Sequence, residues 1–115
     1  MLTSGGDASG MNAAIRAVTR TAASMGIAAI GFERGFDGLM ANTWIELNAR
    51  SVSGIVELGG TILKTARSEL FRTEDGRSQA AAVLRHDGVD GLVVIGGNGS
   101  QTGGYQLSRM GIPVV

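Results

Sequence analysis

Residues 92–100 read LVVIGGNGS, a short apolar run that ends in a cluster of glycines. The first four residues are apolar and partly β-branched, which is typical of a fully buried strand. The glycines mark a sharp turn, and we expect a helix over residues 101–110 and another strand from residue 112 to residue 115. Strands that alternate with helices in this way predict βαβ units and a parallel sheet.

The beginning of the chain has the same order. A short apolar start, residues 1–4, is followed at once by Gly5 and Gly6. Residues 10–25 show helical spacing, and a helix there would end at Gly26. Residues 27–32 then predict a buried strand. The apolar residues expected on one face of the helix are Met11, Ala14, Ile15, Val18, Ala22 and Met25.

The middle of the chain predicts shorter elements. We expect a loop over residues 35–38, a strand over residues 44–47, and a short helix over residues 51–58 that is capped by its first residue. A further helix would begin after Thr73 and end at Gly88. The expected fold class is therefore α/β, Rossmann-like, with three layers (αβα) and a mainly parallel sheet. Because the chain ends inside an expected strand, residues 1–115 are interpreted as an incomplete domain.

The composition excludes several classes of protein. The 115 residues carry ten basic and ten acidic side chains, so the net charge does not favour nucleic acid or a membrane surface as a partner. With no cysteine there is no disulfide framework and no thiolate metal site. The apolar runs are short, and no signal peptide begins the chain. These features predict a cytoplasmic protein.

Three polar segments are candidates for function. Residues 5–12 and 96–104 follow strands, at the edge of a parallel sheet where ligands bind, and their glycines permit close approach of a phosphate. Neither segment is a P-loop or a dinucleotide fingerprint. The alternative is that both are tight structural turns. In residues 59–68, Arg67 could clamp a phosphate or could simply be solvated.

Four stretches resemble the phosphofructokinase family. They are LTSGGDASGMNAAIR at residues 2–16, GFDGL at residues 35–39, GGTILKTAR at residues 59–67 and VVIGGNGS at residues 93–100. The resemblance covers essentially the whole chain, with the motifs in the family's order. It implies transfer of the γ-phosphoryl group of ATP, with Mg²⁺, to the 1-hydroxyl of fructose 6-phosphate, a reaction of glycolysis.

The resemblance also implies roles for individual residues. Gly6 would meet the transferring phosphate through its backbone, and Arg67 would stabilise charge on the ATP phosphates. Asn98 stands where ATP-dependent members carry a Mg²⁺-binding Asp, and Arg16 and Arg20 match the cations of an allosteric effector site. The nucleotide-binding residues implied in this way are Gly6, Arg67, Ser68, Gly97, Asn98, Gly99, Ser100 and Gly103.

Some positions depart from the family pattern. Asn98 is a neutral oxygen ligand and would bind Mg²⁺ more weakly than a carboxylate. Lys64 replaces a family glycine near the phosphates. Gly99 favours ATP, since pyrophosphate-dependent members tend to carry Asp there. The family's catalytic base, an Asp in a segment PGTIDND, would follow Val115, so no catalytic residue is predicted in this chain. Asp7 is interpreted as a structural or Mg²⁺-ordering group.

The family resemblance implies a homo-oligomer, a tetramer in the family, with ATP and fructose 6-phosphate as substrates. One alternative of a different class is a noncatalytic nucleotide-binding or assembly module, which Asn98 favours. Another is a sugar or cofactor kinase with a similar glycine-loop sheet, such as a relative of the NAD kinases. The motifs at residues 5–12 and 59–67 argue against that second alternative.

Overall fold

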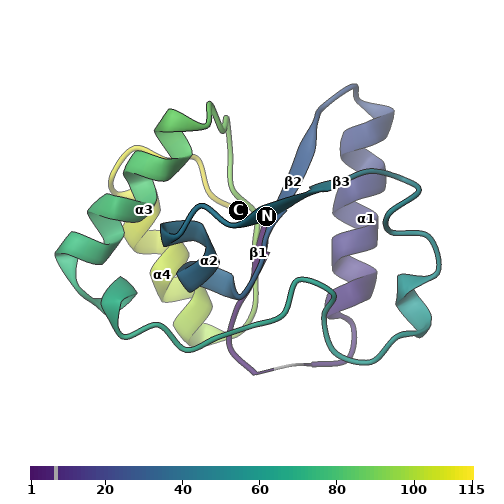
Figure 1. The fold of residues 1–115 in the computed structure, drawn as a ribbon, viewed down its shortest axis with the longest axis horizontal. Helices are drawn as coiled ribbons and strands as arrows, with labels where there is room; N and C mark the ends of the chain where they lie inside the picture. The colour runs from purple at the N-terminus through teal and green to yellow at the C-terminus, as the bar shows by residue number, and fades with distance from the viewer. Residues whose placement is uncertain (7) are drawn as a thin grey trace.

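The computed structural model describes residues 1–6 and 8–115, so the interpretation of Asp7 falls outside the described residues. Over these ranges short strands and helices follow one another in a mixed α/β order (Figure 1). None of the helices in the described ranges is both long enough and apolar enough to span a lipid bilayer.

Two short parallel strands lie at the centre. β1 (Leu2–Thr3) pairs with β4 (Val94–Ile95). On the other side of β4, Leu92 forms a parallel bridge with Val114, which confirms that the end of the chain is extended beside β4. Because β1 and β4 are parallel, the glycine segments that follow them lie at the same edge.

A second, antiparallel pair lies beside the first. β2 (Ala29–Phe32) and β3 (Trp44–Leu47) pair along four residues each. The Met1 amine donates to the Ile30 carbonyl (2.7 Å), and the Phe32 amide donates to the Met1 carbonyl (2.9 Å). These bonds join β2 to the chain just before β1. The strands therefore form two small pairs. The pair of β1 with β4 is parallel, and the pair of β2 with β3 is antiparallel.

Helices lie on both sides of the strands. In Figure 1, α1 stands on one side, and α2, α3 and α4 stand on the other. Two buried apolar clusters fill the space between strands and helices. The first includes Leu2, Phe32, Leu39, Leu84 and Leu107, and the second includes Ile15, Leu47, Val52 and Leu63. The helical bounds are α1 (Met11–Ser24), α2 (Gly35–Met40), α3 (Glu74–His86) and α4 (Asn98–Ser108), with short 3₁₀ turns η1 (Ile55–Glu57) and η2 (Leu70–Arg72).

The ends of α3 confirm the capping predicted from the sequence. The Thr73 hydroxyl oxygen accepts a hydrogen bond from the Gly76 amide at 3.0 Å. Acidic side chains occupy the first turn of α3 and basic ones the last turn, as the helix dipole favours. Gly88, with φ of 69°, ends the helix in the left-handed conformation.

The predicted face of α1 is partly confirmed. Met11 and Ile15 are buried, whereas Met25 is 67% exposed beyond the end of the helix. Two polar residues, Asn12 and Thr19, are also buried on this helix. An apolar pattern could not reveal them.

Three predicted elements are wrong. Residues 35–38 form the first turns of α2, not a loop, because Phe36 and the last two residues of α2 are buried in the core. Residues 51–58 contain only η1, because the Ser51 hydroxyl and the Asn48 backbone bond to each other and close a local turn. α4 begins at Asn98, three residues before the predicted start, so the glycine cluster is part of its first turn.

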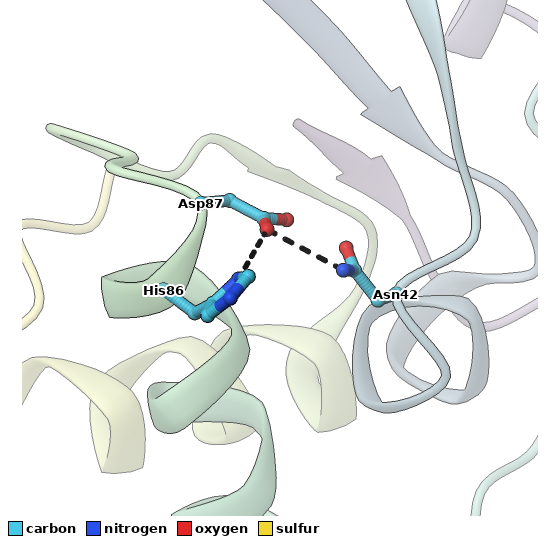
Figure 2. A network of polar contacts seen from close by, with 3 residues as sticks. All are labelled: Asn42, His86 and Asp87. Carbon is cyan, nitrogen blue, oxygen red and sulfur yellow. Dashed lines mark hydrogen bonds and ion pairs between the residues drawn. The ribbon is translucent and has the colours of Figure 1, made fainter.

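The lone histidine of the chain is a surface residue. His86 ends α3, and its side chain is 84% exposed. Figure 2 shows its Nδ1 atom beside the Asp87 carboxylate (3.2 Å), which also accepts a weak hydrogen bond from Asn42 (3.4 Å). This network ties the end of α3 to the turn after α2.

Candidate nucleotide site

Two helices begin at the edge where β1 and β4 end. α1 follows Gly10 and α4 follows Gly97, and neither of these residues provides a side-chain cap. Neither helix has an acidic residue in its first turn. The first amides of a helix have no intrahelical partner, and the helix dipole places partial positive charge there. Both helix starts are therefore suited to bind an anion.

A cleft of about 620 Å³ lies between these helix starts. We call it the first cleft. Glycine and other small residues line most of it. They are Gly5, Gly6, Ala8, Ser9, Gly10, Met11, Ile95, Gly96, Gly97, Gly99 and Ser100.

A second cleft, of about 630 Å³, adjoins the first and shares Gly5, Gly99 and Ser100 with it. Arg67, Arg72 and others line it, and no acidic side chain of residues 1–6 or 8–115 is among them. The remaining lining residues are Ser4, Phe36, Ala66, Ser68, Phe71, Arg77, Thr102, Gly103 and Gln106.

Three of the residues that line the second cleft are arginines. Within the described part of the chain the only ion pair is that of His86 with Asp87, so Arg67, Arg72 and Arg77 have no carboxylate partner there. Guanidinium groups bind phosphate with paired hydrogen bonds. The two clefts together offer backbone amides on one side and guanidinium groups on the other.

The structure brings most of the predicted nucleotide residues to these clefts. Asn98 is the exception, because it is exposed and lines neither cleft. Arg16 and Arg20 lie along α1 and also line neither, so the predicted effector residues are separate from the clefts. The residues at the first cleft are Gly6, Gly97, Gly99 and Ser100, and those at the second are Arg67, Ser68, Gly99, Ser100 and Gly103.

Gly103 has a packing role that the sequence did not reveal. The rings of Phe36 and Phe71 stack with their centroids 3.9 Å apart. A Cβ atom at Gly103 would lie 2.8 Å from the Phe71 ring and 2.9 Å from the Phe36 ring. Glycine at this position therefore lets α4 pack directly on the aromatic pair.

Sequence reasoning missed several residues at or behind the clefts. Arg72 and Arg77 continue from Arg67 at a spacing of five, a signal that was present but not used. Asn12 and Thr3 are buried polar residues that bond to the segment before Arg67. Their role depends on contacts 46 and more residues apart in the sequence, which no local pattern contains.

The described residues alone do not form a magnesium site. No group of three His, Cys, Asp or Glu side chains in residues 1–6 and 8–115 is arranged to hold a metal ion. Among those residues, no carboxylate lines either cleft, and Asn98 offers one neutral amide oxygen outside them. A hard cation prefers several oxygen ligands, mostly charged.

Lys64 adopts a conformation that suits glycine. Its φ is 62°, in the left-handed region, and its carbonyl accepts a hydrogen bond from Thr3. A non-glycine residue pays a steric cost there. A glycine, which the family pattern has at this position, adopts such a φ without this cost.

Replacing Lys64 with glycine is expected to raise the free energy of unfolding by about 1 kcal/mol, because it relieves this strain. Urea unfolding of the full-length protein that carries this sequence measures the change. Lys64→Ala is the control: it removes the amine but keeps the Cβ, so it should give no gain. Equal stabilisation by both variants would attribute the effect to charge and contradict the steric explanation.

Strands that run into glycine turns, followed by uncapped helices whose starts converge on one cleft, are typical of the class of α/β proteins that bind phosphate groups. Within this class, the chain belongs to the phosphofructokinase family. The family model described as "Phosphofructokinase" matches residues 1–115.

Individual relatives agree with this assignment. The chain is 56% identical over 115 residues to an ATP-dependent 6-phosphofructokinase of Clostridium tetani, covering all of this chain and 36% of the relative. It matches the crystal structure of Pichia pastoris phosphofructokinase in the T-state with a TM-score of 0.91 at 41% identity, over 99% of this chain and 12% of that one. A pyrophosphate-dependent phosphofructokinase from Marinobacter aquaeolei shares the fold alone, with a TM-score of 0.82 at 20% identity, over 97% of this chain and 30% of that one. The chain thus spans about a third of the length of the curated relatives that it matches.

Proposed function

We propose that this chain is the nucleotide-binding part of an ATP-dependent 6-phosphofructokinase, which phosphorylates fructose 6-phosphate to fructose 1,6-bisphosphate. Membership of the family and the ATP-dependent relatives support the proposal. The catalytic base is proposed to lie in a segment that follows residue 115 in the full-length protein. This chain would supply the binding of the nucleotide phosphates.

One observation carries the proposal most directly. Gly6, Gly97 and Gly99 line the first cleft, yet a Cβ atom at any of them would meet none of the described residues within 4 Å, and none has a positive φ. Neither packing nor backbone conformation therefore requires glycine at these positions. A ligand that approaches the backbone closely does require it, and phosphate at a helix start is such a ligand.

The chemistry follows from this arrangement. The amides at the starts of α1 and α4 would bind phosphate oxygens, and Arg67, with Arg72 and Arg77, would neutralise their charge. Phosphoryl transfer depends mainly on positioning and on stabilisation of charge, and these residues provide both. Gly99 leaves space for the larger nucleotide and so supports ATP over pyrophosphate as donor.

The proposal predicts that Gly99→Ala weakens ATP binding about tenfold or more, because the added methyl group blocks close approach to the phosphates. The fold should be unaffected, since the position is open and alanine favours a helix. Isothermal titration of the full-length protein with ATP measures the effect. The matched control is Gly91→Ala, a position outside both clefts where a Cβ atom would make only an ordinary contact, 3.7 Å from the Pro113 carbonyl oxygen, and this variant should bind as the wild type does. Equal affinity in the wild type and both variants would contradict phosphate binding at the start of α4.

The reaction itself is tested on the full-length protein. Phosphorylation of fructose 6-phosphate is expected with ATP and not with pyrophosphate. ATP binding without any phosphorylation would favour the alternative, a noncatalytic nucleotide-binding or assembly module. The neutral Asn98 is the observation that supports this alternative.

Further properties belong to the proposal. The whole protein would be a homo-oligomer, a tetramer by family, in the cytoplasm, within a three-layer αβα domain whose sheet is mainly parallel. Mg²⁺ would arrive bound to the nucleotide, and Asn98 is its one proposed contact in this chain, through a water molecule. Arg16 and Arg20 are proposed to contribute to an effector site, and Ser68 to the nucleotide site.

A further inference from the structure

Residues 58–64, which we call the anchored segment, lead directly to Arg67. The segment has almost no regular secondary structure, so its position depends on contacts from elsewhere. Its polar contacts from elsewhere include a hydrogen bond from the Arg34 amide to the Leu63 carbonyl (2.8 Å) and the bonds of two buried side chains, one on α1 and one on β1. Both of these elements adjoin the glycine segment of residues 5–10.

The α1 contact comes from Asn12, which is 2% exposed and lies in the first turn of the helix. Its side-chain amide donates to the Leu58 carbonyl at 3.1 Å, and its Oδ1 atom accepts from the Ile62 amide at 2.8 Å. One buried side chain thus satisfies a backbone acceptor and a backbone donor at two points of the anchored segment. Buried hydrogen bonds of this kind fix geometry, since breaking them leaves unpaired polar groups.

The β1 contact comes from Thr3, whose side chain is fully buried. Its hydroxyl donates to the Lys64 carbonyl at 2.9 Å and lies 3.0 Å from the Thr61 hydroxyl. Because a hydroxyl has a single hydrogen, Thr61 must be the donor to Thr3. Thr61 in turn accepts from the Leu63 amide at 3.2 Å. The four groups form one directional chain of hydrogen bonds.

These contacts connect the anchored segment to both glycine segments. Thr3 pairs with Ile95 across the two central strands, and both residues directly precede the turns that form the first cleft. Arg67 lies three residues beyond Lys64 and faces the second cleft. We propose that Thr3 and Asn12 are positioning residues that hold Arg67 at the phosphate-binding cleft. The inference rests on the proposed function.

Thr3→Val tests the proposal, because valine has nearly the same shape but no hydroxyl. In the full-length protein we expect the dissociation constant for ATP to rise about tenfold, within the range of coupling energies between contacting residues. The stoichiometry of binding should stay unchanged, since a merely unfolded fraction would lower the stoichiometry and not the affinity. Thr3→Ser keeps the hydroxyl and should restore affinity close to that of the wild type.

A matched control is available on α1. Thr19 is 1% exposed, and its hydroxyl has no hydrogen-bond partner among the described residues. Thr19→Val therefore makes the same chemical change at the same degree of burial without breaking a bond. It should leave ATP affinity unchanged. A loss of affinity in Thr19→Val equal to that in Thr3→Val would overturn the proposal.

A double variant tests whether Thr3 acts through Arg67. If it does, Thr3→Val should cause no further loss of ATP affinity when Arg67→Met is already present. If the fold losses of ATP affinity in the two single variants multiply in the double variant, the two residues act independently and the positioning role is refuted.

Hydrogen exchange without nucleotide separates this inference from the proposed function. Thr3→Val should speed exchange of the Leu63 and Lys64 amides, whether or not ATP binds. If the wild type binds no ATP, the proposed function fails, and the positioning role fails with it. If the wild type binds ATP but Thr3→Val changes neither its exchange nor its affinity, only the positioning role is overturned.

Discussion

Replacing Gly96 with alanine is expected to lower the free energy of unfolding by about 3 kcal/mol or more. A Cβ atom at this position would lie 2.5 Å from the Ser4 carbonyl oxygen and 2.7 Å from the Ser100 Cβ, and it would overlap the Ser100 hydroxyl. Backbone cannot yield as a flexible side chain can. The start of α4 would have to move away from the end of β1, which would also open the first cleft.

Chemical denaturation of the full-length protein measures this loss, and titration with ATP measures the damage to the cleft. The neighbouring Gly97 provides a close control. Its φ is −89°, and a Cβ atom there would meet nothing within 4 Å, so Gly97→Ala should change stability by less than about 1 kcal/mol. If the two variants were equally stable, the close contact of β1 with α4 would be disproved.

The elements that the sequence predicted well are those specified by local physical chemistry. α1 follows from its helical apolar spacing, and α3 follows from the cap at Thr73 and the glycine at its end. The strand predicted at residues 92–95 follows from a run of apolar and β-branched side chains, and the structure forms it as β4 (Val94–Ile95) with a bridge at Leu92. Each of these signals lies within a few residues of the structure that it determines.

The elements that were missed depend on distant contacts. Glycines at residues 35 and 38 indicate a loop, but burial of Phe36 and its neighbours in the core outweighs the low helix propensity of glycine. Over residues 51–58, a local bond between Asn48 and Ser51 competes with the predicted helix.

The candidate site shows the same division. The glycine turns could be predicted because glycine clusters directly after a strand have few other uses. Arg67 could be predicted because a guanidinium group is suited to phosphate. The anchoring bonds of Thr3 and Asn12 could not, because they join positions 46 to 61 residues apart in the chain. The clefts therefore have a wall that local motifs predict and a supporting set of bonds that only the fold reveals.

Arg67 is expected to be the side chain whose loss most weakens nucleotide binding. Its guanidinium group is exposed, lines the second cleft, and makes no hydrogen bond or ion pair to other described residues. Arg67→Met should therefore leave the fold intact. It should reduce kcat/KM for ATP in the full-length protein roughly 30- to 100-fold. The reason is that the variant cannot form the charge-assisted pair of hydrogen bonds that Arg67 would make with phosphate in the complex.

The control for this prediction is an arginine at the end of α4 that lies away from the clefts. Arg109 is also exposed but follows the last turn of that helix, about 16 Å from its start, so Arg109→Met should have no effect on kcat/KM. Arg67→Lys keeps the charge but loses the planar pair of donors, and an intermediate loss is expected. The effect of Arg67→Met should also shrink as salt is added, since screening weakens the attraction that the wild type retains. Equal losses at Arg67 and Arg109, or no loss at either, would remove Arg67 from the phosphate site and leave the helix starts as the source of nucleotide affinity.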